Sequence, residues 1–274
     1  MVEKQAGATD VAKAKDSKDK AVVSDSSVMQ VDYFADFDFN SIQLSLESML
    51  KAGVHFGHMK SRRHPKMNRF IYTTRNGLAI INLEETLERA KEAARFLAGV
   101  QKSGKSILVV ATKKQAHDTA RSFARRMKFP FVIDRWIGGT FTNFSVIRSR
   151  AKYLRDTSEK LEKGEFGRYT KFERMKIAEE MEKLEQRMGG IKYMEELPGA
   201  VLLADAKESG IVIHEAKRAH IPIVGIADTN ADPSDIDYPV PANDDAVSSL
   251  RLLFGFFGKE ILSGSEAEKE LQKK

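Results

Sequence analysis

Two stretches of the sequence carry basic residues and no acidic ones. No Asp or Glu lies between Ser48 and Leu83, a range that holds Lys51, Lys60, Arg62, Arg63, Lys66, Arg69 and Arg75. The range from Arg135 to Arg155 is also free of acid and holds Arg148, Arg150 and Lys152. Surface charges that only keep a protein soluble are usually of mixed sign. Acid-free basic segments therefore favour contact with nucleic-acid phosphates, and a solvated basic face is the alternative.

Histidines are concentrated in the first of these stretches, in HFGHMKSRRH. His55 and His58 are three residues apart and could share a metal ion, but zinc needs further ligands. Asp205 and Asp228, each at the end of an expected strand, could supply them if the fold brings them near. The favoured interpretation is that these histidines and His64 stack on RNA or bond to it and to the backbone. We expect no cofactor, with a divalent metal at His55, His58, Asp205 and Asp228 as the alternative.

The same two aspartates lie where an α/β enzyme places its chemistry, at the carboxyl ends of parallel strands. A phosphate-handling enzyme that uses Asp205 and Asp228 is therefore the second function class considered. The sequence has no GxGxxG after its first strand of the sheet and no GxSxG nucleophile elbow. Its one match to GxxxxGK[ST], at 99–106, precedes the apolar run ILVVA, whereas a phosphate loop follows a strand and opens a helix. We expect no catalytic residues, and we expect both aspartates to cap helices or turns.

The segment DRWIGGTFTNF combines residue types that bind RNA. Arg135 and Trp136 offer planar faces for stacking, the glycines let a backbone approach closely, and Thr142 and Asn143 can reach phosphate oxygens. The alternative is that Trp136 anchors the structure locally, and both roles are compatible.

Composition agrees with a polyanionic partner. The 274 residues carry 45 Lys and Arg against 39 Asp and Glu, a formal charge of +6. The absence of cysteine excludes disulfides, thiolate zinc sites and a cysteine nucleophile. No run approaches the ~20 apolar residues of a membrane-spanning helix, and the N-terminus does not resemble a signal peptide. We expect a soluble, cytoplasmic protein.

The elements that would position these residues follow from hydrophobic periodicity. Short apolar runs such as ILVVA, FVI, AVLLAD and IPIVGIAD alternate with amphipathic helices, which predicts a doubly wound, mostly parallel sheet. A helix over 45–52 and a hairpin with an Asn76-Gly77 turn precede it. The final helix is expected from 244 to about 262.

Between Phe144 and Ile191 the apolar residues follow a heptad pattern in two pieces, separated by a connector with Gly164 and Gly167. We predict an antiparallel coiled-coil helical hairpin that protrudes from the body, the alternative being two helices packed flat on the sheet. The predicted domains are an extended or disordered N-terminal extension (1–40), the α/β body (41–143 and 192–262), the hairpin (144–191) and a polar tail (263–274).

Residues 28–39, VMQVDYFADFDF, interleave aromatic and acidic side chains. We favour the hypothesis that this stretch lies against the body as an irregular strand. It could otherwise be a motif for a neighbouring protein, or could imitate RNA on the basic surface of this chain.

The ordered motifs resemble those of the bacterial small-subunit ribosomal protein two family. The similarity runs from about Leu46 to Leu253 and covers AGVHFGH, HPKMNRFIY, RNGLAIINLEET, LVVATKKQA, DRWIGGTFTNF, MGGIKYMEELPGAV, DTNADPSDIDYPVPANDDA and SLRLL. His64 before Pro-Lys-Met and Ala206-Lys207 after AVLLAD depart from the family's pattern. The resemblance implies a flavodoxin-like α/β body with a coiled-coil hairpin.

The resemblance also implies a structural, non-catalytic ribosomal component. Such a protein binds small-subunit rRNA and neighbouring ribosomal proteins, and helps dock ribosomal protein one. We expect no membrane contact and no homo-oligomer. The RNA-binding residues carried over by motif are Lys60, Arg62, Arg63, Lys66, Arg69, Lys113, Lys114, Arg135, Trp136, Thr142 and Asn143.

Overall fold

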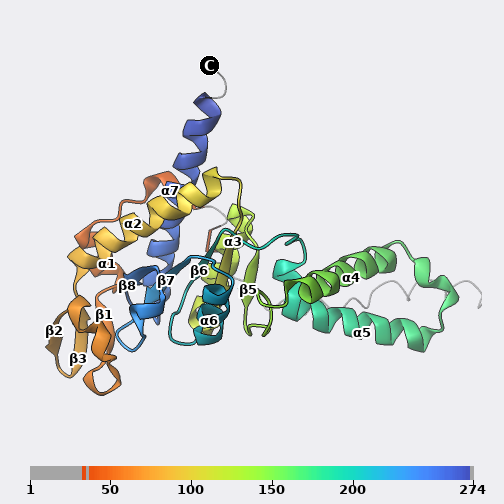
Figure 1. Cartoon of the computed structure of the whole chain (residues 1–274), viewed down its shortest axis with the longest axis horizontal. Coiled ribbons are helices and arrows are strands. Elements are labelled where there is room, and N and C mark those ends of the chain that lie inside the picture. The colour runs from red at the N-terminus through yellow and green to blue at the C-terminus, as the bar shows by residue number, and fades with distance from the viewer. Residues whose placement is uncertain (1–32, 35–36, 272–274) are drawn as a thin grey trace, which may run out of the picture. The chain divides into compact units, whose positions relative to one another are not determined.

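The structure is a computed structural model that describes residues 33, 34 and 37–271, except the side chains of residues 40 and 265–271 (Figure 1). Backbone contacts divide the chain into Met1–Val31 and Asp32–Lys274, and all described residues belong to the second unit. Predictions for residues 1–32, 35, 36 and 272–274 lie outside the described residues.

A five-stranded parallel sheet is built from the short apolar runs. Its strands are β4 (Ile107–Ala111), β5 (Phe131–Ile133), β6 (Ala200–Leu203), β7 (Ile223–Ala227) and β8 (Tyr238–Pro241), in the order β5-β4-β6-β7-β8. Every residue of β4, β6 and β7 is buried, as is typical of parallel strands covered on both faces. Counted from β4, the strand order is 2-1-3-4-5, that of flavodoxin-like doubly wound folds. The predicted α/β fold class is confirmed.

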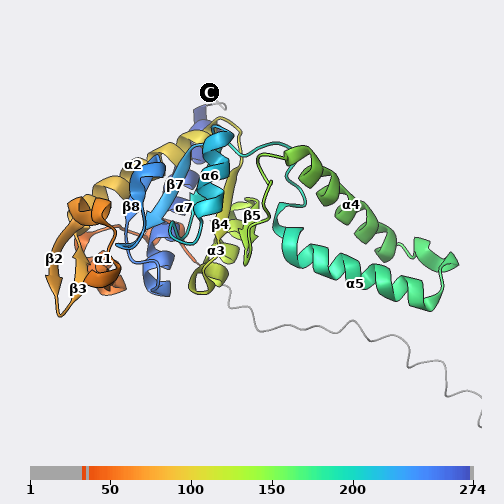
Figure 2. The ribbon, with the colours of Figure 1, turned by 60° about the horizontal axis from the view of Figure 1, so that its bottom comes forward.

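Helices cover both faces of this sheet (Figure 2). One core joins α2 (Leu83–Lys102), α3 (Lys114–Met127) and α7 (Val247–Leu271) to Ile107 and Val109 of β4. The other core joins α6 (Gly210–Arg218) and α4 (Phe144–Glu162) to Leu108 and Val110. Alternate residues of one strand therefore serve opposite cores. None of the helices among the described residues is long and apolar enough to cross a membrane.

Helix α7 runs past its expected end near residue 262, to Leu271. The sequence after Gly264 is SEAEKEL, in which good helix formers continue without proline. Part of the predicted polar tail is therefore helical.

A second, antiparallel sheet of three strands has the order β1-β3-β2, with β1 (Phe56–Met59), β2 (Ile71–Arg75) and β3 (Leu78–Ile81). Asn76 and Gly77 both have positive φ, at 50° and 79°, as a tight hairpin turn requires. The hairpin and the helix before it, α1 (Leu46–Ala52), are confirmed. Strand β1 was not expected. It lies in the acid-free segment between α1 and the hairpin, for which no regular element was predicted. The two 3-10 helices Lys60–Arg62 and Pro65–Phe70 follow it.

The heptad segment forms α4 (Phe144–Glu162) and α5 (Lys171–Met188). Both views show these helices side by side, beyond β5 (Figures 1 and 2). Ile147, Ala151 and Leu154 are buried in one core with Met181 and Met188, so the predicted apolar residues do pack together. That the pair is a coiled coil stays a prediction.

The described part of the aromatic-acidic stretch packs against the body, as the favoured hypothesis predicts. It contains a 3-10 helix, Phe39–Ser41, rather than a strand. Phe34 and Phe39 are buried in the core that includes Phe123 and α7. A Cβ at Gly258 of α7 would lie 2.4 Å from Cε1 of Phe39, so glycine is needed for this close approach.

Candidate nucleic-acid interface

The loops after the parallel strands meet at the carboxyl end of the sheet, where doubly wound folds place their functional groups. They bring together Lys113 after β4, Asp205 after β6, Asp228 after β7 and Asp244 after β8. His58 of β1 joins them from the small sheet: its Nδ1 lies 3.0 Å from Oδ2 of Asp228. The two sheets therefore share this polar region.

Thr229 holds the small sheet against β7. Its Oγ1 accepts the N–H of His58 at 2.8 Å, and its carbonyl oxygen accepts the N–H of His64 at 2.8 Å. A Cβ at residue 57 would lie only 2.5 Å from Cγ2 of Thr229, so Gly57 permits the approach. These contacts position the segment that we call the basic loop, residues 58–69.

The basic loop presents its cations to solvent. Met67 and Phe70 are buried and fix its second 3-10 helix, whereas Lys60, Arg62 and Lys66 are exposed and Arg63 is partly exposed. Within the described part of the chain, Lys60, Arg62 and Arg63 form no ion pair. This arrangement leaves cations free to contact phosphates.

Two cations of this loop have intramolecular partners. The guanidinium carbon of Arg69 lies 4.5 Å from the centre of the Phe70 ring. Nζ of Lys66 lies 2.9 Å from Oδ2 of Asp232. The hydrogen bond from Lys66, aided by those from Ser234, lowers the pKa of Asp232 to about 2.

Lys113 does not lie on the exposed basic surface on which we expected it. Its Nζ is 2.6 Å from carboxylate oxygens of both Asp244 and Asp245. Although burial lowers the pKa of Lys113, the two carboxylates raise it above its usual range. Its neighbour Lys114 is exposed at the start of α3, and remains available to a polyanion.

Trp136 is only 8% exposed. Its indole N–H donates to Oε1 of Glu215 at 3.2 Å. The same carboxylate accepts the N–H groups of Gly139 at 2.8 Å and Phe141 at 3.1 Å. This burial favours the anchoring role of Trp136 over base stacking.

Residues 134–143, between β5 and α4, form the loop that Trp136 anchors, which we call the Trp136 loop. Arg135, Thr142 and Asn143 do lie on its surface. Sequence reasoning did not single out Glu215, which organises this loop. Its only signal was one acid in the mostly apolar start of a helix, GIVIHEA.

A cluster at the carboxyl end of the sheet has the donor set of a cation site. Ligand atoms of His58, Asp228, Asp244 and Asp245 all lie within 4.8 Å of one another. Oδ2 of Asp244 is buried without a hydrogen-bond partner. Burial, and then the charge of Asp228, raise the pKa of Asp244 to about 8. A divalent cation would satisfy this oxygen and offset the buried negative charge.

This cluster contains two of the four metal ligands that the sequence suggested. His58 and Asp228 belong to it, but His55 does not: its ring packs 4.0 Å from that of Phe56. Asp205 instead accepts the N–H groups of Lys207 and Glu208, at 2.8 and 3.1 Å. Its expected capping role is confirmed.

Residues 49–264 match the family model described as ribosomal protein S2. The chain belongs to the ribosomal protein S2 family. It is therefore a structural constituent of the small ribosomal subunit and takes part in translation. The matched range contains the basic loop, the Trp136 loop and both helices α4 and α5, and it confirms the family expected from the motifs.

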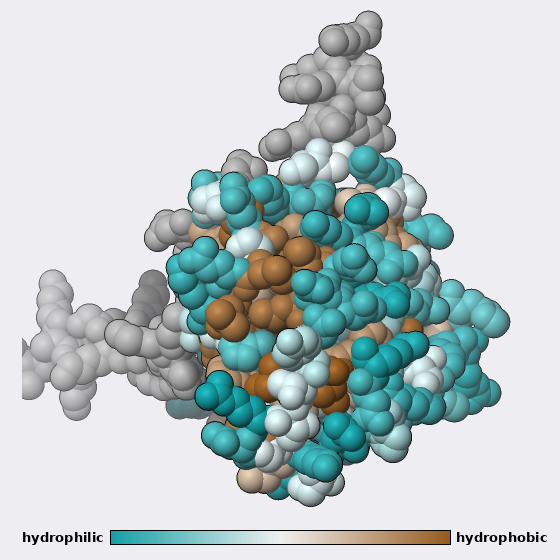
Figure 3. All heavy atoms as spheres, turned by 90° about the vertical axis from the view of Figure 1, so that its left-hand side faces the viewer, coloured by the Kyte–Doolittle hydropathy of each residue, from teal (hydrophilic) through white to brown (hydrophobic). Residues whose placement is uncertain are grey.

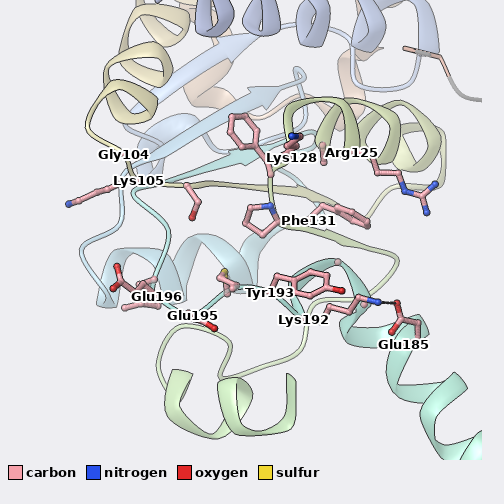
Figure 4. A pocket seen from close by; sticks show the side chains of 18 residues that line it. Gly104, Lys105, Arg125, Lys128, Phe131, Glu185, Lys192, Tyr193, Glu195 and Glu196 are labelled. Carbon is pink, nitrogen blue, oxygen red and sulfur yellow. Dashed lines mark hydrogen bonds and ion pairs between the residues drawn. The ribbon is translucent and has the colours of Figure 1, made fainter. Parts of the chain in front are cut away.

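The chain has a further cavity, of about 740 Å³, lined by residues near the amino ends of β4 and β5. Figure 4 shows Lys105, Arg125 and Lys128 around it, together with Tyr193, Glu195 and Glu196. Nζ of Lys192 pairs with Glu185 at 2.8 Å in the same region. Because acids and bases alternate here, this cavity suits a polyanion less well than the basic loop does.

Proposed function

We propose that this chain binds small-subunit rRNA in the cytoplasm, as a single copy, through a surface of exposed cations and polar side chains. The surface consists of Lys60, Arg62, Arg63, Lys66, Arg69, Lys114, Arg135, Thr142 and Asn143. Lys113 and Trp136 are not part of this surface: they are largely buried and bind Asp244 and Glu215 inside the protein. The observation that carries the proposal concerns Arg62, which is exposed, and Arg63, which is partly exposed. Both lie in an acid-free segment and have no ion-pair partner among the described residues.

Salt dependence tests this proposal. Each phosphate neutralised contributes about 0.7 to 0.9 to the slope of log affinity against log salt. Replacing Arg62 and Arg63 by Ala should therefore weaken rRNA binding and reduce the slope by up to about 2. The control replaces Lys91 and Arg95 by Ala, because both are exposed on α2 and their loss changes the net charge equally. Equal effects of the two double variants would contradict site-specific binding.

We also propose that an exposed apolar face docks a neighbouring ribosomal protein, for which ribosomal protein one is the expected partner. Leu46, Leu50 and Tyr72 line a groove of about 560 Å³ between α1 and the small sheet. Figure 3 shows apolar side chains gathered on this side of the molecule. The Tyr72 side chain is 76% exposed. An exposed apolar cluster of this kind is typical of protein interfaces.

Retention of ribosomal protein one on small subunits tests the docking proposal. Tyr72→Ala should reduce its retention and leave rRNA affinity unchanged, because the groove carries no cationic side chain. Tyr193→Ala is the control. Tyr193 is similarly exposed, at 71%, but lines the cavity near the amino ends of β4 and β5 and not the apolar groove. Full retention in Tyr72→Ala would argue against this face.

A further inference from the structure

One face of α4, close to the Trp136 loop, carries a groove that is separate from the basic loop. Ser145, Val146, Ser149, Arg150 and Tyr153 line it, and its volume is about 450 Å³. Residues 146, 149, 150 and 153 follow the spacing of a single helix face. Val146 is 50% exposed and Tyr153 is 47% exposed, so this face is not used to pack against α5. We call it the α4 groove.

The charge around the α4 groove has a single sign. From Phe144 to Arg155 there are four basic residues and no acidic ones, whereas α5 carries five of each sign. Arg148, Arg150 and Lys152 form no ion pair with any other described residue. On α5, by contrast, Lys183 pairs with Glu179 at 2.6 Å. The first half of α4 thus lacks the internal charge balance of its neighbour.

We propose that the α4 groove binds an unpaired nucleotide of the small-subunit rRNA. Tyr153 offers its ring face to the base, as aromatic side chains do for unstacked bases. Arg150 contacts the phosphate, and the Ser145 hydroxyl donates to it. The Ser149 hydroxyl donates to the carbonyl oxygen of Ser145 at 2.9 Å, so its oxygen accepts from a ribose hydroxyl. The amino end of α4 adds the positive end of a helix dipole.

The α4 groove is a contact distinct from the basic loop. Helix α4 follows β5, at one edge of the main sheet, whereas Thr229 ties the basic loop to the end of β7, toward the other edge (Figure 1). Strands lie about 4.8 Å apart, so roughly 14 Å of sheet separate the two strands. The inference rests on the proposed rRNA binding and adds to it a second site of different chemistry.

The test compares rRNA affinities of full-length variants. Tyr153→Ala should weaken binding by about tenfold, whereas Tyr153→Phe, which keeps the ring, should bind as wild type. Tyr169→Ala is the matched control, because Tyr169 is 48% exposed in the connector between α4 and α5. Arg150→Gln should weaken binding and flatten the salt dependence. All four variants should keep the wild-type melting temperature.

A single-stranded oligouridylate and an RNA duplex distinguish stacking from simple charge attraction. The oligouridylate should bind Tyr153→Ala less tightly than wild type, and the duplex should bind both equally. Equal losses for the two probes would overturn the nucleotide site, as would an unchanged rRNA affinity in Tyr153→Ala. If Tyr153→Ala instead releases a neighbouring protein from small subunits at full rRNA affinity, the groove docks protein and the inference fails.

The two proposals fail separately. If Arg62→Ala with Arg63→Ala weakens rRNA binding and Tyr153→Ala does not, the rRNA function stands and the α4 groove does not take part. If neither substitution weakens binding, both proposals are overturned.

Discussion

The indole N–H of Trp136 donates to the carboxylate of Glu215, 79 residues further along the chain, at 3.2 Å. The same carboxylate accepts the N–H groups of Gly139 and Phe141. One buried acid thus fixes the loop that leads from β5 into α4, and with it Thr142, Asn143 and the start of the α4 groove.

Replacing Glu215 by Gln should destabilise the fold by about 2 kcal/mol, because hydrogen bonds to a charged acceptor are lost. Urea denaturation measures this change. Glu208→Gln is the control, since Glu208 is exposed nearby and accepts none of these bonds. We also expect weaker rRNA binding from Glu215→Gln, through its effect on the loop. A stability equal to that of the control would show that the carboxylate is not required.

The contribution of Glu215 should depend on pH. Burial would raise its pKa, but the hydrogen bonds from Gly139, Phe141, Trp136 and Thr142 hold the pKa below the usual 4.5. A depressed carboxyl pKa stabilises the fold above the unfolded value, and this contribution is lost as pH falls through the folded value. The stability difference between wild type and Glu215→Gln should therefore shrink below pH 4.5. A stability difference that stays constant below pH 4.5 would contradict a depressed pKa of Glu215.

Asp232 should titrate at about 2 because its partner is Lys66. In Lys66→Ala the pKa of Asp232 should rise toward the ordinary 3.8, whereas Lys60→Ala should leave it low. Carbon NMR of the carboxyl group measures the titration. Bound RNA should also raise this pKa if phosphates draw Lys66 away from Asp232, and no change on RNA binding would argue that Lys66 stays paired.

Gly57→Ala should destabilise the protein by about 1 to 3 kcal/mol, the usual effect of overpacking. The new Cβ would lie 2.5 Å from Cγ2 of Thr229. Adding Thr229→Ser removes that methyl group and keeps the hydroxyl, so it should restore part of the stability. Gly99→Ala is the control, because no atom lies within 4 Å of its Cβ position. A melting temperature that is unchanged in Gly57→Ala would refute the close approach.

Two truncations separate the aromatic contacts from the rest of the N-terminal residues. Deletion of residues 1–40 removes Phe34, Phe37 and Phe39, and should lower the free energy of unfolding by about 3 kcal/mol or more. Deletion of residues 1–31 keeps all three rings, and is the matched control. Urea denaturation curves that coincide for the two truncations would show that the rings do not stabilise the body.

Divalent cations should raise the melting temperature of the full chain if the cluster of His58, Asp228, Asp244 and Asp245 binds them. Because the pKa of Asp244 is raised to about 8 without a cation, binding must release its proton and should strengthen from about pH 6 to about pH 8. Asp244→Asn should abolish the shift, and Asp232→Asn, an exposed control, should not. A cation-induced shift of equal size in Asp244→Asn would exclude this site.

Periodicity within the sequence was sufficient to predict most elements of the fold. The apolar runs that became β4, β6 and β7, the positive-φ turn at Asn76 and Gly77, and the seam of α4 and α5 all follow from neighbours a few residues apart. Local signals of this kind reflect rotamer, turn and helix preferences that act within one element. The motifs were sufficient for the family as well.

What the sequence by itself determined was therefore the type of most elements and the acid-free charge of the basic loop. Tertiary structure alone decided which side chains meet. Lys113 turns inward to Asp244, Glu215 binds the Trp136 loop, and His58, but not His55, pairs with Asp228. Such pairs lie far apart along the chain, and their contact depends on strand order and on the packing of one sheet against another. No periodicity within a single element encodes that arrangement.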